Sequence, residues 1–266
     1  MTIRKKYLLL SALIEFLIVF TIGIFSLKSE NFLFNYILYS IIFLVLLRSV
    51  FKVNSRLWMY LYANYMNVLD KELDPEKFIE LTENEYNKNK NKKYRNYMKL
   101  HLSAGYSSAG KIEMAYKKLK EVDLSKKLYR ERDKILYYSN EVLFLITLGK
   151  KEAATEIYNK YLSEEIGKIK NNKKLSKIYC GFIKVLEGML FHENDNEKMI
   201  EILNEALKKS KTKRQNLGFK YLLATYKEKI GEIQEAMELY KEVIENGNKL
   251  YIVQEAKEKL ENINRI

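Results

Sequence analysis

The chain has 266 residues, a formal net charge of +13, one proline and ten glycines. So few turn-forming residues exclude a β-sandwich or β-barrel, which needs many tight turns, and they favour long helices. The only cysteine, Cys180, excludes an internal disulfide and gives no sign of an oxidising compartment. The composition therefore predicts an all-α chain.

Two apolar stretches open the chain, at residues 7–27 and 31–51. Each is long enough to cross about 30 Å of hydrocarbon as a helix. Only residues 28–30 separate them, so we expect a transmembrane helical hairpin that forms a membrane anchor over residues 1–56. A cleavable signal peptide is excluded, because no small-residue cleavage site follows the first stretch and the second begins at once.

The charges inside these stretches are Glu15 and Arg48. An ionisable side chain within the hydrocarbon is by default a candidate functional site. Two helices with one acid form no ion pathway, however, and the long side chain of Arg48 is expected to reach towards Glu15 across the hairpin. We therefore expect these two residues to support hairpin packing rather than ion transport.

Basic residues flank the hairpin on both sides: Arg4, Lys5 and Lys6 before it, and Arg48, Lys52 and Arg56 at its end. The positive-inside rule then places both termini in the cytoplasm, as in a two-span protein of the cell membrane. Residues 57–266 are accordingly expected to be cytoplasmic. Trp58, Tyr60 and Tyr62 follow the second stretch, where amphipathic rings suit the headgroup layer.

A spacing pattern recurs along residues 57–266. A turn glycine is followed by a small residue five positions later, a large one at nine and an apolar one at twelve. The copies are Gly110 with Ala115, Leu119 and Val122; Gly149 with Ala154, Tyr158 and Tyr161; Gly231 with Ala236, Tyr240 and Val243; and a degenerate Asn194 with Met199, Leu203 and Ala206. Glycine ends one helix in a left-handed turn, and the small residue lets the next helix cross closely.

This pattern resembles the tetratricopeptide repeat over about residues 93–246, with Gly231–Val243 as its best copy. A further helix pair is expected at 57–90, and a terminal capping helix at 249–266. The resemblance implies an α-solenoid of about five helix pairs. The turn positions recur after 39, 45 and 37 residues rather than the family's usual 34 or so, and the repeat-ending proline is missing.

We call the first helix of each pair A and the second B. The B-to-A turns, at 87–99, 125–134, 168–177 and 208–220, carry a summed charge of +20. The A-to-B turns, at 70–76, 107–113, 148–152, 193–198 and 229–235, carry −5. Since antiparallel pairing places the two kinds of turn on opposite edges, we expect a solenoid that is charged from edge to edge.

The most basic stretch, NKNKNKKYRN at residues 87–96, has five positive charges and no acid. It follows a B helix, on the edge where the first A helix begins and the anchor ends. We expect its basic side chains to face anionic headgroups of the inner leaflet: Lys88, Lys90, Lys92, Lys93 and Arg95. A merely solvated turn stays open as an alternative, since lysine also suits helix C-termini.

The tetratricopeptide resemblance also implies that partners bind on a concave face lined by the A helices. The positions of this chain that would face such a groove are Tyr97, Ser107, Ser139, Lys184, Phe191, His192, Tyr221 and Lys229. The family's two-carboxylate clamp for peptide C-termini is not reproduced, because Leu100 and Ala104 in one repeat, and Lys184 and Gly188 in another, stand at its positions.

No phosphate loop, metal cluster or nucleophile motif occurs in the sequence, so we expect no enzyme and no cofactor. Nucleic acid is disfavoured as a partner, because no recognition-helix or glycine–aromatic pattern accompanies the lysines. The function expected is a membrane-anchored cytoplasmic adaptor that binds protein or peptide partners through its solenoid. The alternative is a signalling regulator whose tetratricopeptide-like domain changes shape on binding a peptide.

Overall fold

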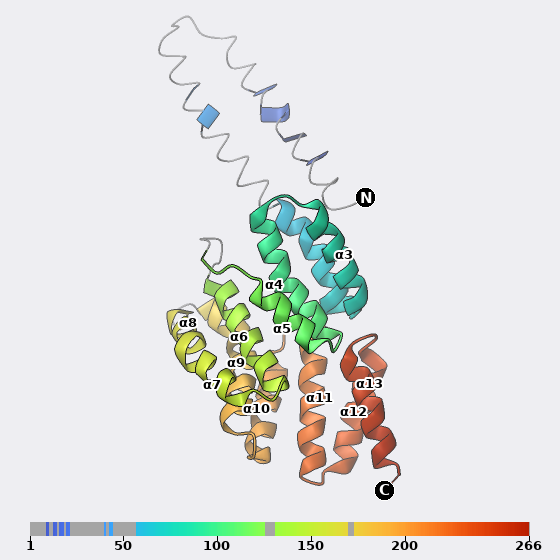
Figure 1. Cartoon of the computed structure of the whole chain (residues 1–266). Helices are drawn as coiled ribbons and strands as arrows, with labels where there is room; N and C mark the ends of the chain where they lie inside the picture. Colours follow the sequence, from blue (N-terminus) through green and yellow to red (C-terminus); the bar gives the residue numbers. More distant parts are fainter. Residues whose placement is uncertain are drawn as a thin grey trace, which may run out of the picture.

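Every regular element that the computed structural model describes is a helix (Figure 1). The described residues are 9–10, 13–14, 16–18, 20–21, 40, 43–44, 57–125, 131–169 and 173–265. No helix in this part of the chain combines the length and apolar character needed to cross a membrane. The spans expected at 7–27 and 31–51 lie outside the described residues apart from those short pieces, and so do Glu15 and Arg48.

The helices follow one another as pairs packed in series. Residues 57–67 continue into the π-helical η1 (Val68–Glu72) and pair with α3 (Pro75–Lys88). The later pairs are α4 (Lys92–Ser108) with α5 (Ile112–Lys120); α6 (Glu131–Thr147) with α7 (Lys151–Ile157), η2 (Tyr158–Leu162) and α8 (Ser163–Ile169); α9 (Lys173–Phe191) with α10 (Asn196–Lys209); and α11 (Lys213–Lys229) with α12 (Ile233–Asn246). The last helix, α13 (Tyr251–Ile263), packs on α12. An all-helical, solenoid-like arrangement is thereby confirmed for the described residues.

The turn glycines behave as their spacing predicts. Gly110, Gly149 and Gly231 have φ angles of 76°, 71° and 86°, in the left-handed region that glycine adopts without strain. The fourth pair differs, because its turn contains no left-handed residue among those described. There the side chain of Asp195 caps α10 instead, accepting a hydrogen bond from the main-chain N–H of Lys198 at 2.9 Å.

The small residues five positions after the turn glycines are fully buried, as close helix crossing requires: Ala115, Ala154 and Ala236. The third pair departs from the pattern further along. The π-helical η2 adds a residue to that turn of the helix, so Leu162 is fully buried where the spacing placed Tyr161, which is only partly buried. The pattern therefore predicts the helix crossings but not this local change of register.

The first A-to-B turn closes the series of helices on itself. Leu73 has a φ of 58° and is fully buried in the hydrophobic cluster of the last helices, with Leu217 of α11, Tyr240 of α12 and Ile252 of α13. The main-chain N–H of Lys249 donates to the carbonyl oxygen of Leu73 at 3.2 Å. Figure 1 shows α11 and α13 extending from this end of the first pair.

Polar contacts surround the buried leucine: Asn248 Nδ2 donates to the carbonyl oxygen of Glu72 at 2.7 Å, Lys249 Nζ lies 2.7 Å from Asp74 Oδ2, and Arg214 Nε lies 2.8 Å from Asp70 Oδ1. We call these contacts between residues 70–74 and residues 214–252 the closing contact. They correct the prediction that the two kinds of turn stay on opposite edges. The basic turn at 208–220 reaches the acidic turn at 70–76, because the path of the solenoid curves back on itself.

The closing contact generates a stability prediction. Leu73→Ala should lower the free energy of unfolding by about 2–5 kcal/mol, because it empties a fully buried site between the first pair and the last helices. The measurement is urea unfolding followed by helical circular dichroism. Met114→Ala on α5 is the matched control: this side chain is 50% exposed, so the change should stay within about 0.5 kcal/mol. Equal effects of the two substitutions would show that Leu73 is not buried in the folded chain.

Tyr251 generates a second prediction. It lies against the Gly110 turn, where a Cβ on Gly110 would come within 3.0 Å of the Cβ of Tyr251. Burial raises the pKa of Tyr251 to about 12, and the carboxylate of Glu255 adds to the effect. The protonated side chain of Tyr251 contributes fully to the free energy of unfolding below the unfolded-state pKa of about 10, and this contribution is lost as the pH rises towards 12.

The free energy of unfolding should therefore fall between about pH 10 and pH 12, and less steeply in Tyr251→Phe than in the parent chain. Some decline should remain in the variant, because burial also raises the pKa of Tyr137 to about 12. Urea unfolding at a series of pH values measures both slopes. If the free energies of unfolding of the parent chain and of Tyr251→Phe fell with pH at the same slope, Tyr251 would be exposed to solvent in the folded chain.

Candidate functional site

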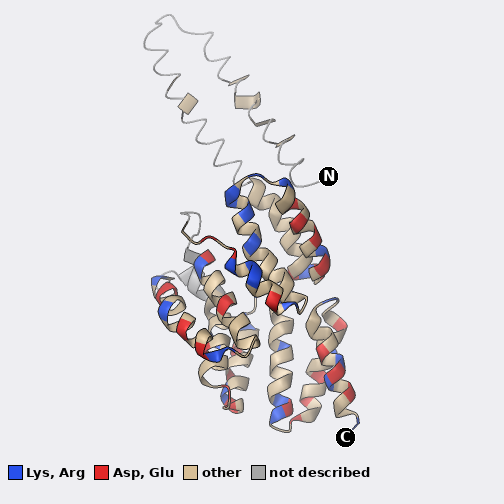
Figure 2. Cartoon of the chain, in the orientation of Figure 1, with Lys and Arg blue, Asp and Glu red and all other residues tan. Residues whose placement is uncertain are grey.

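The basic stretch lies where residues 57–67 begin. The ring of Trp58 stacks on that of Tyr94, with centroids 4.1 Å apart and an angle of 8° between the planes. Tyr94 belongs to the first turn of α4, so residue 57 and the turn between α3 and α4 share one end of the molecule. In Figure 2 the start of α4 is coloured as Lys and Arg positions. We call this surface the basic end: Lys88, Lys90, Lys92, Lys93 and Arg95.

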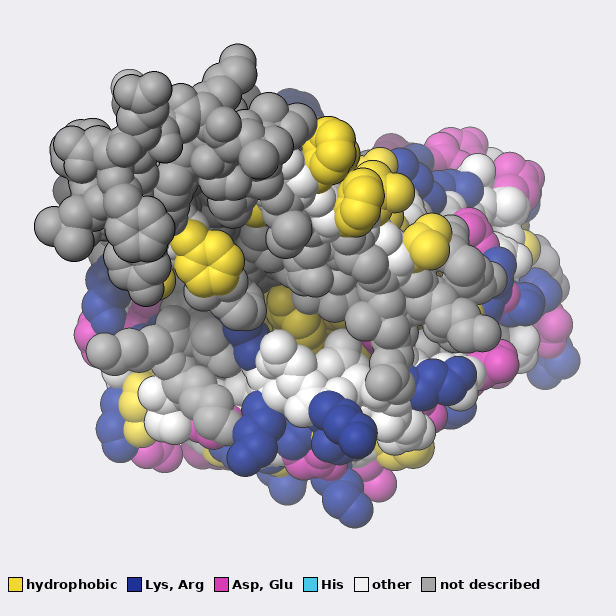
Figure 3. Space-filling view, turned by 90° about the horizontal axis from the view of Figure 1, so that it is seen from above, with side chains coloured by type: hydrophobic (Ala, Val, Ile, Leu, Met, Phe, Trp, Pro, Cys, Tyr) yellow, Lys and Arg dark blue, Asp and Glu magenta, His cyan; other side chains and the backbone are white. Residues whose placement is uncertain are grey.

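Three of these side chains carry charge that no carboxylate compensates within the described part of the chain. Lys90, Lys92 and Lys93 are exposed, and within the described part of the chain no carboxylate lies within ion-pair distance of them. Arg95 differs, because its guanidinium carbon sits 4.3 Å from the centroid of the Tyr86 ring. Figure 3 looks onto the molecule from above, where Lys and Arg side chains are visible together with Asp and Glu.

Helix electrostatics explain only part of this arrangement. Lys88 lies in the last turn of α3, where the helix dipole favours a cation. Lys92 and Lys93, by contrast, occupy the first turn of α4, which contains no acid and where the same dipole disfavours them. Helix stability therefore does not account for the lysines at the start of α4.

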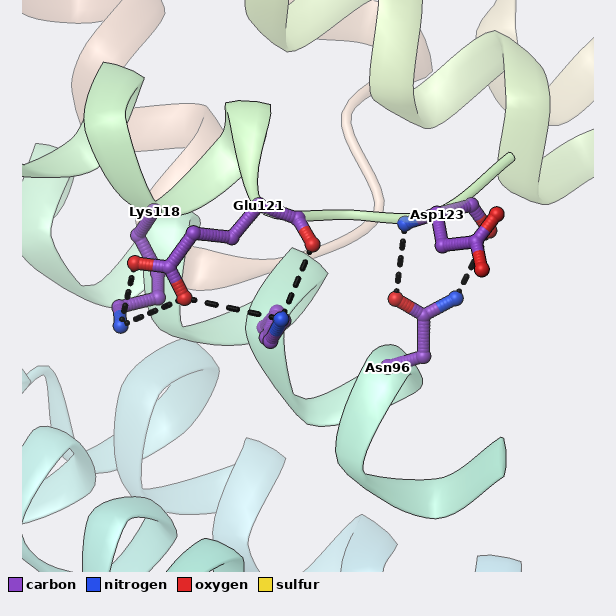
Figure 4. A network of polar contacts seen from close by, with 5 residues as sticks. Asn96, Lys118, Glu121 and Asp123 are labelled. Atoms are coloured by element: carbon purple, nitrogen blue, oxygen red, sulfur yellow. Dashed lines mark hydrogen bonds and ion pairs between the residues drawn. The ribbon is translucent and has the colours of Figure 1, made fainter. Parts of the chain in front are cut away.

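Two lysines near the basic end, Lys99 and Lys118, form ion pairs, in contrast to the three exposed lysines of the basic end itself (Figure 4). Asn96 holds the main chain of Asp123: its Nδ2 donates to the carbonyl oxygen at 2.8 Å, and its Oδ1 accepts from the N–H at 2.9 Å. Beside this clamp the carboxylate of Glu121 lies 3.0 Å from Lys118 and 3.7 Å from Lys99. These contacts fix the end of α5 against α4, next to the basic end.

The aromatic residues after the anchor do not all have the expected exposure. Trp58 and Tyr62 are almost fully buried and stack on each other at 5.0 Å, so they belong to a hydrophobic core rather than to a headgroup layer. Tyr60 alone of the three is exposed, at 72%. The helical repeat explains the difference, since residues 58 and 62 share the inward face and residue 60 points away.

Half of the residues expected in a concave groove are occupied with packing or turn formation. Tyr97 contacts the ring of His101 at 4.3 Å, Ser139 is fully buried in α6, and Tyr221 lies 6.0 Å from the ring of Tyr240. Ser107 is in the last turn of α4, where its carbonyl oxygen accepts from Gly110 at 3.0 Å. A groove lined by these four residues stays a prediction.

The other four expected groove residues are more exposed. Lys184 pairs across to Glu205 of α10 at 3.0 Å, so it is directed at a B helix. Lys229 lies over the Tyr226 ring, 4.6 Å from its centroid. Phe191 and His192, however, come together with residues of two neighbouring turns around one surface hollow of about 590 Å³. We call it the turn hollow, and it is lined by Lys151, Phe191, His192, Glu193, Asn194, Asp195, Asn196, Glu197 and Ile230.

The lining of the turn hollow is acidic, with three carboxylates and one lysine. Lys151 Nζ lies 2.6 Å from Glu193 Oε2; this hydrogen bond lowers the pKa of Glu193, and the charge of Lys229 adds to the effect. Asp195 is engaged as the cap of α10, and the carboxylate of Glu197 has no ion pair within the described residues. The hollow therefore retains negative charge after its internal pairing.

Sequence reasoning missed the remaining side chains of this hollow. Lys151 follows one turn glycine and Ile230 precedes another, so the turn pattern contained a signal for both. It missed the closing contact as well, which no local pattern marks, because Asp70 and Arg214 are separated by 144 positions.

Comparison with known proteins gives no relative. No protein-family model matches the chain, and neither a curated protein nor a solved structure is similar to it.

Proposed function

We propose that this chain is a membrane-anchored adaptor, held in the cell membrane by residues 1–56, whose cytoplasmic solenoid binds protein or peptide partners. In this proposal both termini are cytoplasmic and the basic end faces the anionic inner leaflet. Each Lys or Arg close to such a leaflet contributes about 1 kcal/mol of attraction, within a Debye length of about 8 Å.

The observation that carries the proposal is the position of the uncompensated lysines. Trp58 stacks on Tyr94, so Lys90, Lys92 and Lys93 lie beside the place where an anchor at residues 1–56 would join the solenoid. Two of them occupy a first helical turn that disfavours cations. An anionic surface next to residue 57 supplies the compensation that the described part of the chain lacks.

We also propose that the helix pairs are of the tetratricopeptide type. The left-handed turns at Gly110, Gly149 and Gly231 and the buried alanines five residues later support this, because they reproduce the spacing of the repeat. Solenoids of helix pairs offer extended surfaces to partners. Protein or peptide is therefore the partner class that we propose.

The lipid contact is tested on the full chain in nanodiscs. The lysines at positions 90, 92 and 93 should react with an amine-modifying reagent several-fold more slowly in anionic than in zwitterionic lipid, as measured by mass spectrometry. High salt should remove the difference, because the Debye length falls to about 3 Å at 1 M. Lys241, exposed on α12, is the internal control and should react equally in both. Equal rates for the three lysines in both lipids would reduce the stretch to a solvated turn.

The topology is tested by cysteine labelling in a Cys180→Ala background. With a membrane-impermeant maleimide, Ser29→Cys should be modified in intact bacterial cells, because residue 29 lies in the turn of the proposed hairpin. Lys257→Cys, on the exposed side of α13, should be modified only after lysis. Labelling of position 257 in intact cells would overturn the proposed orientation.

A further inference from the structure

The turn hollow combines exposed apolar side chains with excess acid. Phe191 is 50% exposed and Ile230 is 38% exposed, and both line the hollow. The ring of Phe191 packs edge-on against that of Tyr158, with centroids 5.5 Å apart, so its position is fixed although half of its surface faces solvent. An aromatic ring held rigid and exposed in a concave site is suited to anchor a partner's apolar side chain.

The charge of the hollow is opposite to that of the chain as a whole. The chain has a net charge of +13, yet three carboxylates and one lysine line this site. Lys151 is paired with Glu193 and Asp195 caps α10, whereas the carboxylate of Glu197 has no ion pair within the described residues. Complementary charge selects for a basic group in the occupant.

The position of the hollow leaves it accessible to a cytoplasmic partner. It is built from the turns that join α6 to α7, α9 to α10 and α11 to α12. Figure 1 shows the turn between α11 and α12 at the end of the molecule opposite the turn between α3 and α4, which carries the basic end. Contact of the basic end with a leaflet would therefore leave the hollow free.

From these features we infer that the turn hollow binds an extended peptide segment in which a bulky apolar residue stands next to a lysine or arginine. The apolar side chain lies against Phe191 and Ile230, and the basic one meets Asp195 and Glu197. This inference rests on the proposed function, since it names the site and the partner chemistry of the adaptor.

The test uses the full chain in zwitterionic nanodiscs, so that a basic peptide gains nothing from the lipid. The probe is a fluorescent synthetic peptide with two Arg-Leu steps between glycine and serine, and its binding is followed by anisotropy. Changing Leu to Ser or Arg to Glu in the peptide should each weaken binding by about tenfold or more.

Two variants of the chain localise the site. Phe191→Ser should weaken binding of the Arg-Leu peptide about tenfold, and so should the double variant Asp195→Asn with Glu197→Gln. Asparagine retains the cap of α10, so the double variant keeps its helix while losing the charge. The matched controls, Met114→Ser on α5 and Glu258→Gln with Glu261→Gln on α13, change exposed residues away from the hollow and should leave binding unchanged.

Absence of binding, or equal binding by the hollow variants and the controls, would overturn the inference. So would binding accompanied by a doubling of mass in which the chain's own basic end fills the hollow of a second copy. Lysine protection in anionic nanodiscs is measured on the same preparations. If the lysines were protected but no peptide bound, this inference would fail while the proposed membrane contact would stand.

Discussion

The burial of Leu73 among α11, α12 and α13 is the constraint on which the arrangement of the helices depends. A leucine in the left-handed region costs about 1–2 kcal/mol of backbone strain. Full burial of its side chain returns about 1.5–3 kcal/mol, and the hydrogen bonds from Asn248 and Lys249 hold the strained turn in place. A turn that would otherwise be an exposed tip thus becomes part of the core of the last helices.

This closure brings the first and last pairs of the solenoid together. An open solenoid keeps its first and last repeats apart, whereas here η1 of the first pair contacts α11 of the fifth. Of the side chains that the repeat pattern assigned to a groove, Tyr97 packs against His101 within α4 and Ser139 is buried in α6, both away from the closing contact. Phe191 and Ile230, at two other turns, remain exposed.

The sequence was sufficient for the parts of the fold that depend on local spacing. Each glycine turn depends on the φ preference of one residue, and each helix crossing depends on one alanine. A pattern a few residues long, such as Gly231 with Ala236, is therefore enough to predict both. The π-helical turn at η2 escaped prediction because its effect, burial of Leu162 instead of Tyr161, is decided by packing against the neighbouring pair. The closing contact could not be predicted either, because it depends on packing between residues far apart in the sequence, and nothing near Leu73 indicates a partner in α11.

The two candidate sites differ in the same way: one is a local feature of the sequence, and the other is formed by segments that are distant in the sequence. The basic end was visible because five like charges in ten residues are a local feature, while the hollow required three separate turns to be brought together.

Closure also decides which charges remain available to partners. The acidic turn at 70–76 meets the basic turn at 208–220 through Asp70 and Arg214, so part of each is neutralised within the molecule. The lysines at positions 90, 92 and 93 have no such counterpart among the described residues. In the turn hollow Glu193 is paired with Lys151, whereas Glu197 has no ion pair among the described residues. The curvature that brings the first and last helices together thus leaves a basic surface and a hollow lined by an excess of carboxylates at separate ends of the described chain, where partners of opposite charge would find complementary groups.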